Sequence, residues 1–358
     1  MTFNKEKYLS FVSGILAVLV VLVSCNQFSK KVEMKVSEVK LFPIVQGNVW
    51  GYIDTSGKVV INPQFGEAQY FSENLAAVRV GSKDIGKYGY IDSTGKIVIY
   101  PQFNYAGPFS EGRAVVRTDW WSGEFGKDGY INKKGDLVID TQFTKASDFH
   151  EGLAWVLTNE KFGYIDTTGK MIITPQFENA GDFSEGLANV DMDTIKGYID
   201  KTGKLIIRTH YDDIYPFSCS RARVDTYTLG GGRGAVSYVG YIDKSGKVVI
   251  DLKLFGGHDF SEGLAVDNEG LTFCYIDTTG KIVIPPLFIW AQDFSGGLAV
   301  VTVGGKDGYI DKTGKFIINP QFDKAEKFIK GLAVVKFNNN AGYINKSGKL
   351  IWALKPMK

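Results

Sequence analysis

Seven aspartates stand at the same place in near-copies of one short motif, Asp-x-x-Gly-Lys, and such carboxylates could act as acids, bases or metal ligands. They are Asp54, Asp92, Asp166, Asp200, Asp243, Asp277 and Asp311. In two further copies Asn132 and Asn345 take this position. An amide does not replace a catalytic carboxylate, but it accepts the same hydrogen bonds in a turn. The exchange therefore indicates that the aspartates stabilise turns.

Other residue types that could carry chemistry lack a suitable pattern. Gly169-Lys170 echoes a phosphate-binding loop, but an apolar residue follows where that motif needs Ser or Thr. Three histidines at different repeat positions, His150, His210 and His258, predict no convergent metal site. Repeated glutamates, predicted to cap turns, are Glu73, Glu111, Glu151, Glu185 and Glu262. We therefore predict a protein that is not an enzyme and uses no cofactor or metal.

The first 25 residues differ from the rest of the chain. Lys5 and Lys7 precede an apolar run from about residue 11 to residue 23, as in a signal peptide. The run ends in Leu22-Val23-Ser24-Cys25, which resembles a bacterial lipobox. The resemblance implies cleavage before Cys25 and acylation of its thiol, which would hold the protein on a membrane. A retained membrane span is the alternative, but the run is shorter than the roughly 20 apolar residues that a span needs.

These features predict three parts of the chain. Residues 1–24 form a lipoprotein signal peptide, residues 25–40 the lipidated cysteine and a polar tether, and residues 41–358 the folded domain. The predicted location is the bacterial cell envelope, at the outer membrane, facing either the periplasm or the surface. The near balance of 41 Lys and Arg against 39 Asp and Glu argues against a nucleic-acid partner. Cys219 and Cys274 stand at different repeat positions, so no disulfide is predicted.

Nine tyrosines mark an internal repeat, each in a Gly-Tyr-Ile-Asp string or a close relative. They are Tyr52, Tyr90, Tyr130, Tyr164, Tyr198, Tyr241, Tyr275, Tyr309 and Tyr343, separated by 38, 40, 34, 34, 43, 34, 34 and 34 residues. A phenylalanine follows each of the first eight after 19 residues, so all extra length falls between this phenylalanine and the next tyrosine. One part of the 34-residue unit is therefore fixed, and the other contains a loop that accepts insertions.

The fixed part predicts short strands joined by tight turns. In the unit at Tyr164, Asp-x-x-Gly forms a hairpin turn, and the apolar run Met171-Ile172-Ile173 forms the next strand. Pro175 is expected to end that strand, because proline cannot donate to the ladder. A packed crossover, Gln176–Gly186, then leads to a third strand at Leu187-Ala188-x-Val190. The prolines expected to act in the same way in other units are Pro63, Pro101, Pro286 and Pro320.

Three motifs recur in most units: Gly-Tyr-Ile-Asp-x-x-Gly-Lys, Pro-Gln-Phe-x-x-Ala and Phe-Ser-Glu-Gly-Leu-Ala. With them the chain resembles the WG repeat, also called the KWG repeat, of bacterial proteins. Trp50-Gly51 keeps the tryptophan that this family often places before the glycine, whereas most other units do not. The resemblance covers about residues 41–353. It implies a bacterial repeat protein, and it implies no common catalytic activity.

The fold predicted from these units is all-β, with about nine three-stranded antiparallel units. One such meander cannot bury its apolar faces alone, so consecutive units must stack. A crossover from the outer strand of one unit to the inner strand of the next is typical of propeller blades. We therefore predict a propeller-like ring, with an open β-solenoid or superhelix as the alternative.

The insertions enter one hairpin loop of the unit, so we expect them to gather on one face or rim. Exposed Trp, Tyr and Arg dominate binding hot spots, although these aromatic residues could instead pack on their own loops. The candidate binding residues are Trp120, Trp121, Phe125, Arg221, Arg223, Tyr227, Arg233 and Tyr238. The leading hypothesis is a non-catalytic, lipid-anchored scaffold that binds a protein or an envelope polymer. The alternatives are a cell-wall or glycan-binding module and an enzyme with its site in a central channel.

Overall fold

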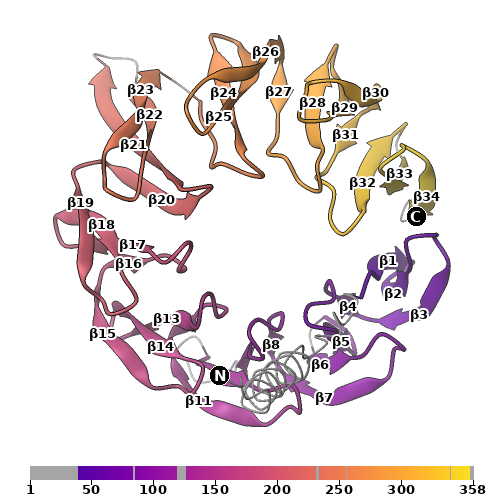
Figure 1. Cartoon of the computed structure of the whole chain (residues 1–358). Helices are drawn as coiled ribbons and strands as arrows, with labels where there is room; N and C mark the ends of the chain where they lie inside the picture. Colours follow the sequence, from indigo (N-terminus) through magenta and orange to yellow (C-terminus); the bar gives the residue numbers. More distant parts are fainter. Residues whose placement is uncertain are drawn as a thin grey trace, which may run out of the picture. The chain divides into compact units, whose positions relative to one another are not determined.

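The structure, a computed structural model, describes residues 39–83, 85–118, 126–230, 234–254, 256–338 and 340–354. Within these residues the chain forms nine small antiparallel sheets arranged as the blades of a closed β-propeller (Figure 1). The predicted all-β ring is confirmed, and the open solenoid is not observed. Each blade lies next to the blade that follows it in the sequence.

The strands of each blade follow one another in the chain, from the inside of the ring outward. Blades 1 to 3 comprise β1 (Phe42–Gln46), β2 (Val49–Ile53), β3 (Val59–Phe65); β4 (Glu67–Ala68), β5 (Ala76–Val80), β6 (Lys87–Ile91), β7 (Ile97–Phe103); and β8 (Tyr105–Ala106), β9 (Ala114–Arg117), β10 (Asp128–Ile131), β11 (Leu137–Phe143). Blades 4 to 6 comprise β12 (Lys145–Ala146), β13 (Leu153–Thr158), β14 (Lys161–Asp166), β15 (Met171–Phe177); β16 (Asn179–Ala180), β17 (Ala188–Met192), β18 (Ile195–Ile199), β19 (Leu205–Thr209); and β20 (Asp213–Ser218), β21 (Arg221–Gly230), β22 (Gly234–Ile242), β23 (Val248–Leu254). Blades 7 to 9 comprise β24 (Leu264–Glu269), β25 (Thr272–Asp277), β26 (Ile282–Phe288); β27 (Trp290–Ala291), β28 (Ala299–Val303), β29 (Lys306–Ile310), β30 (Phe316–Phe322); and β31 (Lys324–Ala325), β32 (Leu332–Phe337), β33 (Asn340–Asn345), β34 (Leu350–Leu354).

Most blades have four strands, so the prediction of three-stranded units was wrong in this respect. Seven sheets are four-stranded, and only blades 1 and 7 are three-stranded in the described residues. The extra strand is usually a two-residue stretch of the crossover. In blade 9, for example, Lys324 and Ala325 pair with Lys336 and Val335. Its brevity hides it from a sequence pattern, because a strand is recognised by alternation over at least four residues.

The prolines do not end the strands, which corrects a second prediction. β15 continues through Pro175 to Phe177, and the other outer strands containing these prolines also reach the phenylalanine two residues later. The register between β14 and β15 shifts between Phe162 and Tyr164, which marks a bulge. These outer strands lie at the edge of a sheet, where proline is tolerated because no neighbouring strand needs its missing N–H.

The core lies in the seams, which we define as the interfaces between neighbouring blades. Tyr309 is fully buried in the seam between blades 8 and 9, and its ring centroid lies 4.8 Å from that of Phe328. The Tyr309 hydroxyl donates to the carbonyl oxygen of Glu326, 17 residues ahead, at 2.8 Å. The first seven tyrosines of the repeat make the same bond over the same interval. The aromatic residues therefore join each blade to the next.

The ring closes at the seam between β34 of blade 9 and β1 of blade 1, which we call the closing seam. Here the Tyr343 hydroxyl donates to the carbonyl oxygen of Pro43 at 2.9 Å, and the ring of Phe42 lies 5.7 Å from that of Tyr343. Lys330 of blade 9 also reaches the carbonyl oxygen of Phe71 at 2.7 Å. Side-chain contacts alone thus connect the two ends of the described chain.

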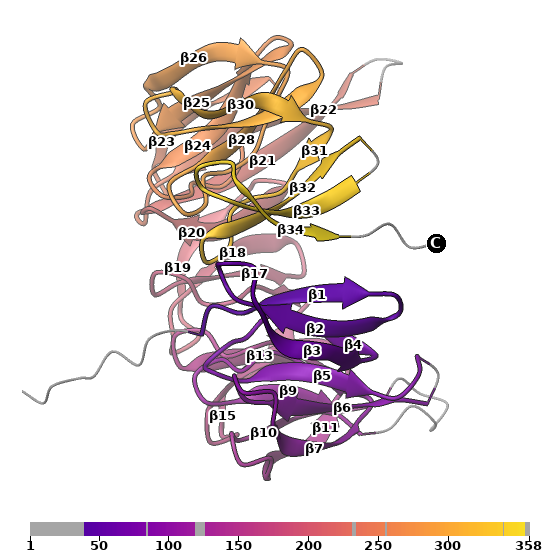
Figure 2. The same ribbon diagram turned by 90° about the vertical axis from the view of Figure 1, so that its right-hand side faces the viewer.

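The two faces of the ring carry different connections. The turn face holds the Asp-x-x-Gly turns and the Phe-Ser-Glu-Gly turns. The loop face holds the hairpins between inner and middle strands and the crossovers between blades; Figure 2 shows β1 running toward this face. All three insertions belong to loop-face hairpins, between β5 and β6, β9 and β10, and β21 and β22. The structure thus places the insertions on one face, as the sequence predicted.

Candidate binding surface

The aspartates of the turn face are engaged in turn hydrogen bonds. Oδ1 of Asp166 accepts from the Thr168 hydroxyl at 2.5 Å, from the Thr168 N–H at 2.9 Å and from the Lys170 N–H at 3.1 Å. These bonds, led by that of the hydroxyl, hold the pKa of Asp166 below its usual value. Asn345 accepts equivalent bonds from Ser347 and Lys349. The geometry confirms the turn role that the Asp-to-Asn exchange indicated.

Asp166→Asn is therefore expected to change the melting temperature at pH 7 by no more than about 2 °C, because the amide oxygen replaces the acceptor. The native pKa lies below the unfolded one, so the carboxylate contributes stability at neutral pH and loses it as the pH falls through the native pKa. The variant should thus lose less stability than the wild type below about pH 4. Melting curves from pH 2 to 7 test this, and parallel losses in both proteins would contradict it.

The repeated glutamates tie each blade to the next. Glu151 of blade 4 accepts from the Gly186 N–H of blade 5 at 3.0 Å and forms a 3.1 Å ion pair with Lys201. Although partial burial opposes ionisation, Lys201 and the backbone donors hold the pKa of Glu151 below its usual value. Glu73, Glu111, Glu185 and Glu262 accept from the next blade in the same way. The predicted capping role is confirmed, and it extends across the seam.

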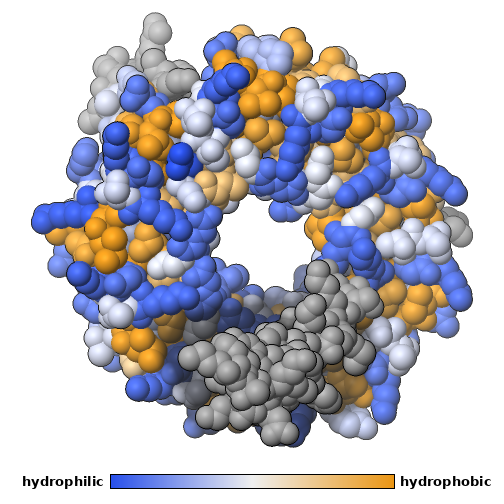
Figure 3. All heavy atoms as spheres, in the orientation of Figure 1, coloured by the Kyte–Doolittle hydropathy of each residue, from blue (hydrophilic) through white to orange (hydrophobic). Residues whose placement is uncertain are grey.

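The turn face offers no other arrangement suited to metal binding. Across the described part of the chain, no group of three or more His, Cys, Asp and Glu residues is placed to hold a metal ion. Figure 3 looks onto this face and shows hydrophilic residues around much of the central opening. Cys219 is a free thiol, so the two cysteines do not form a disulfide. The repeated ionisable groups therefore have structural partners, and a binding surface must be sought elsewhere.

Several candidate binding residues from the sequence lie outside the described residues: Cys25, Trp120, Trp121, Phe125 and Arg233. Among the others, Arg221 lies on the turn face, where its Nε donates to the carbonyl oxygen of Thr278 in blade 7 at 2.8 Å. Arg223 stacks over the Tyr215 ring at 3.5 Å and donates to Gly257 at 3.0 Å. Both arginines thus bridge blades 6 and 7.

The two tyrosines of the long blade 6 hairpin point in different directions. Tyr227 pairs with Ser237, whereas Tyr238 pairs with Thr226, so the tyrosines lie on opposite faces of the sheet. Tyr227 is 43% exposed, and its hydroxyl donates to the Asp213 carboxylate at 2.6 Å. This bond raises the pKa of Tyr227. Of the candidates from the sequence, Tyr227 is the described residue most available to a partner on the loop face.

An exposed apolar patch, missed by the sequence reasoning, lies beside this hairpin. It consists of Leu271, Leu287, Ile289 and Trp290, which we call the blade 7 patch; they are 93%, 65%, 56% and 48% exposed. Leu271 occupies the β24–β25 hairpin, and the other three lie at the end of β26 and in the crossover to β27. Trp290 is held edge-on to Phe273, with 5.5 Å between ring centroids. Contiguous exposed apolar residues of this kind mark interaction sites.

The signal for this patch was present in the repeat alignment. The crossover after blade 7 reads PPLFIWAQDF, whereas that after blade 8 reads NPQFDKAEKF. Leu287, Ile289 and Trp290 therefore replace a glutamine, an aspartate and a lysine. Position-by-position comparison of the units would have found three adjacent polar-to-apolar changes. Attention to insertion length alone passed over them, because this unit has the base period.

The repeat can now be assigned to a family. The family model described as "WG containing repeat" matches residues 50–83, 88–119, 129–162, 162–193, 197–225, 240–266, 275–306 and 308–340. The chain belongs to the WG-containing repeat family. These segments run through all nine blades of the propeller, which confirms the resemblance seen in the sequence.

Comparison with other known proteins adds little to this assignment. Hsv2 of Kluyvelomyces marxianus is 12% identical, with a TM-score of 0.38 over 56% of this chain and 76% of that chain. Apo AztD of Citrobacter koseri is also 12% identical, with a TM-score of 0.38 over 88% and 93%. The Neurospora crassa Pan2 WD40 domain is 10% identical, with a TM-score of 0.33 over 76% and 89%. No curated protein matches the sequence.

Proposed function

We propose that this WG-repeat propeller is a non-catalytic, lipid-anchored protein of the bacterial envelope that binds a protein partner through its loop face. The blade 7 patch carries the proposal, since it gathers four large apolar side chains on one part of that face. Its exposed area is on the order of several hundred Å², the range in which a patch on a monomer is often functional. The Leu22–Cys25 motif supports the anchor, and no helix in the described residues could cross a membrane.

The chemistry of the loop face favours a protein over a small ligand. Trp290 is a rigid aromatic residue flanked by aliphatic side chains, which is the composition of a protein-binding hot spot. On the neighbouring blade, Tyr227 and Asp213 add exposed polar groups next to this apolar centre. An apolar centre with a polar rim is the usual anatomy of a protein interface.

A variant that restores the repeat tests this proposal. Leu287→Gln, Ile289→Asp and Trp290→Lys introduce together the residues found at the equivalent positions after blade 8, so folding should be retained. In cells of the native host, the triple variant is expected to reduce crosslinking to the major partner at least about tenfold, the effect of losing a hot-spot residue. Quantitative mass spectrometry of the crosslinked proteins measures the loss. Cys25→Ala in the same cells should release the protein from the membrane fraction.

Tyr100→Lys is the matched control, because Tyr100 is an exposed aromatic residue of blade 2, outside the patch. It should leave crosslinking unchanged. Equal crosslinking by wild type and triple variant would reject the loop-face proposal. Binding of the wild type but not the triple variant to purified peptidoglycan would instead support the glycan-binding alternative. Membrane retention of Cys25→Ala would reject the anchor.

A further inference from the structure

An ordinary seam is filled by the segment of chain that crosses it. Between blades 8 and 9, β30 ends in the buried Phe322, whose ring lies 6.4 Å from that of Tyr309. The chain then forms β31, in which Ala325 pairs with Val335 of β32. Phe328 follows, with its ring 4.8 Å from that of Tyr309. Two aromatic rings and a two-residue strand thus occupy this seam.

The closing seam has only part of this filling. Phe42 stands at the position of Ala333, as the strand pairings Phe42–Ile53 and Ala333–Ile344 show, and it supplies one ring beside Tyr343. The second ring has no counterpart in the sequence. Phe322 follows its repeat tyrosine, Tyr309, by 13 residues, and the residue 13 places after Tyr343 is Pro356. Neither end of the chain therefore carries an aromatic residue at the equivalent position.

The inner edge of blade 1 is also unpaired in the described residues. β1 pairs with β2 alone, so blade 1 has no counterpart of β31 within the described part of the chain. By the same alignment, Ile44 and Val45 correspond to Val335 and Lys336, which pair with β31. An unpaired strand edge is a ready template for another extended segment.

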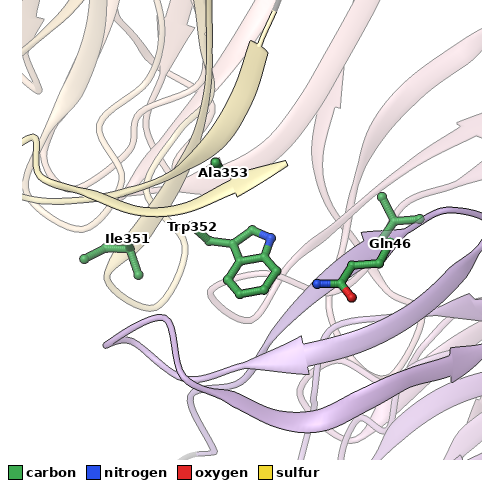
Figure 4. Close-up of a pocket in the computed structure, with 5 residues that line it drawn as sticks. Gln46, Ile351, Trp352 and Ala353 are labelled. Carbon is green, nitrogen blue, oxygen red and sulfur yellow. The ribbon is translucent and has the colours of Figure 1, made fainter. Parts of the chain in front are cut away.

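A pocket of about 320 Å³ opens where the crossover runs in the other seams. It is lined by Val45, Gln46, Ile351, Trp352 and Ala353, from β1 and β34 (Figure 4). Trp352 replaces the buried isoleucine of the other outer strands, and its Nε1 is buried without an acceptor. Figure 4 shows the indole of Trp352 between Ile351 and the Gln46 amide. Apolar walls with one unsatisfied donor suit a ligand that brings an apolar side chain and an acceptor.

We propose that the closing seam is a docking site for an extended segment of a partner protein that carries a phenylalanine. The phenylalanine enters the pocket in the role of Phe322. The two residues that correspond to β31 pair with the edge of β1 at Ile44 and Val45, and a backbone carbonyl accepts from Nε1 of Trp352. This is recognition by strand addition, in which the backbone gives affinity and the side-chain pocket gives selectivity. The site is separate from the blade 7 patch, so it stands whether or not the loop-face proposal does.

The chain itself supplies the probe for this site. A fluorescent decapeptide with the sequence of residues 319–328, NPQFDKAEKF, should bind saturably to the purified full chain in nanodiscs. A peptide with Phe322→Ala should bind at least about tenfold more weakly, which is the value of burying a phenylalanine side chain. Trp352→Phe in the protein should weaken binding about three- to tenfold through loss of one donor. Fluorescence anisotropy measures each affinity.

Two further variants make the outcome decisive. Ala353→Arg places a long side chain at the exposed mouth of the pocket and should abolish binding even if Trp352→Phe destabilises the fold. Tyr100→Lys, remote from the seam, should leave the affinity unchanged. Absence of saturable binding, equal affinities for the two peptides, or tight binding that survives Ala353→Arg would each overturn the proposal. The first outcome would fit occupation of the pocket by the chain's own ends.

Discussion

Phe42→Ala is expected to lower the free energy of unfolding by about 3–5 kcal/mol, although it introduces the residue found at this position in the other eight blades. Phe42 is 1% exposed, and its ring lies against Tyr343 across the closing seam. In the other blades the alanine is accompanied by a phenylalanine from the crossover, such as Phe328 beside Ala333. Blade 1 has no such partner in the described residues, so the truncation leaves a cavity.

The position of the loss distinguishes this variant from an ordinary core truncation. Neighbouring blades elsewhere are joined by the chain itself, whereas the closing seam is held by contacts such as the bond of Tyr343 to Pro43. Hydrogen exchange should therefore accelerate first in β1–β3 and β34. Phe328→Ala, the matched control, should cost a similar free energy but accelerate exchange at the seam between blades 8 and 9. A loss below about 1 kcal/mol for Phe42→Ala, or uniform acceleration around the ring, would contradict this account of closure.

Tyr164→Phe should lower the free energy of unfolding by about 1–3 kcal/mol, because it removes a single buried donor. Tyr164 is fully buried, and its hydroxyl donates to the carbonyl oxygen of Gly181 at 2.7 Å. The substitution leaves that carbonyl without this donor and preserves the ring packing on Phe183. The same bond recurs at every seam, which explains why the repeat keeps tyrosine at this position.

Urea denaturation of Tyr164→Phe and of the control Tyr100→Phe measures this effect. Tyr100 is exposed, so its hydroxyl can be satisfied by water and its removal should cost less than about 0.5 kcal/mol. Equal stabilities of the two variants would show that the buried hydroxyl makes no net contribution. In that case the preference for tyrosine at this repeat position would need another cause.

The local structure of the unit was largely predictable from its residues. Gly169 has φ of 86° in its turn, the conformation that the Asp-x-x-Gly spacing required, and the apolar run after it forms β15. The exchange of Asp166 for Asn345 between units correctly separated a turn acceptor from a catalytic group. These features depend on contacts within a few residues, so a short sequence pattern specifies them.

The errors arose where the identity of the neighbouring strand mattered. Pro175 lies within β15 because that strand is at the sheet edge, and edge position is a property of the assembled blade. The two-residue strand β31 exists because it meets β32 of its own blade. Likewise, Leu287 and Ile289 could belong to a buried strand by composition, and only the assembled ring shows that they are exposed.

The sequence by itself determined the nine-fold all-β repeat, its turns and the loop that takes insertions, because each is encoded in local residue types and their spacing. The tertiary structure decided whether the array closes, which residues remain exposed, and how the closing seam differs from the others. Closure depends on the small rotation between blades, summed around the ring, and on contacts such as that between Tyr343 and Pro43, 300 residues apart. No pattern within one repeat specifies that sum, so the pocket beside Trp352 appears only when the two ends meet.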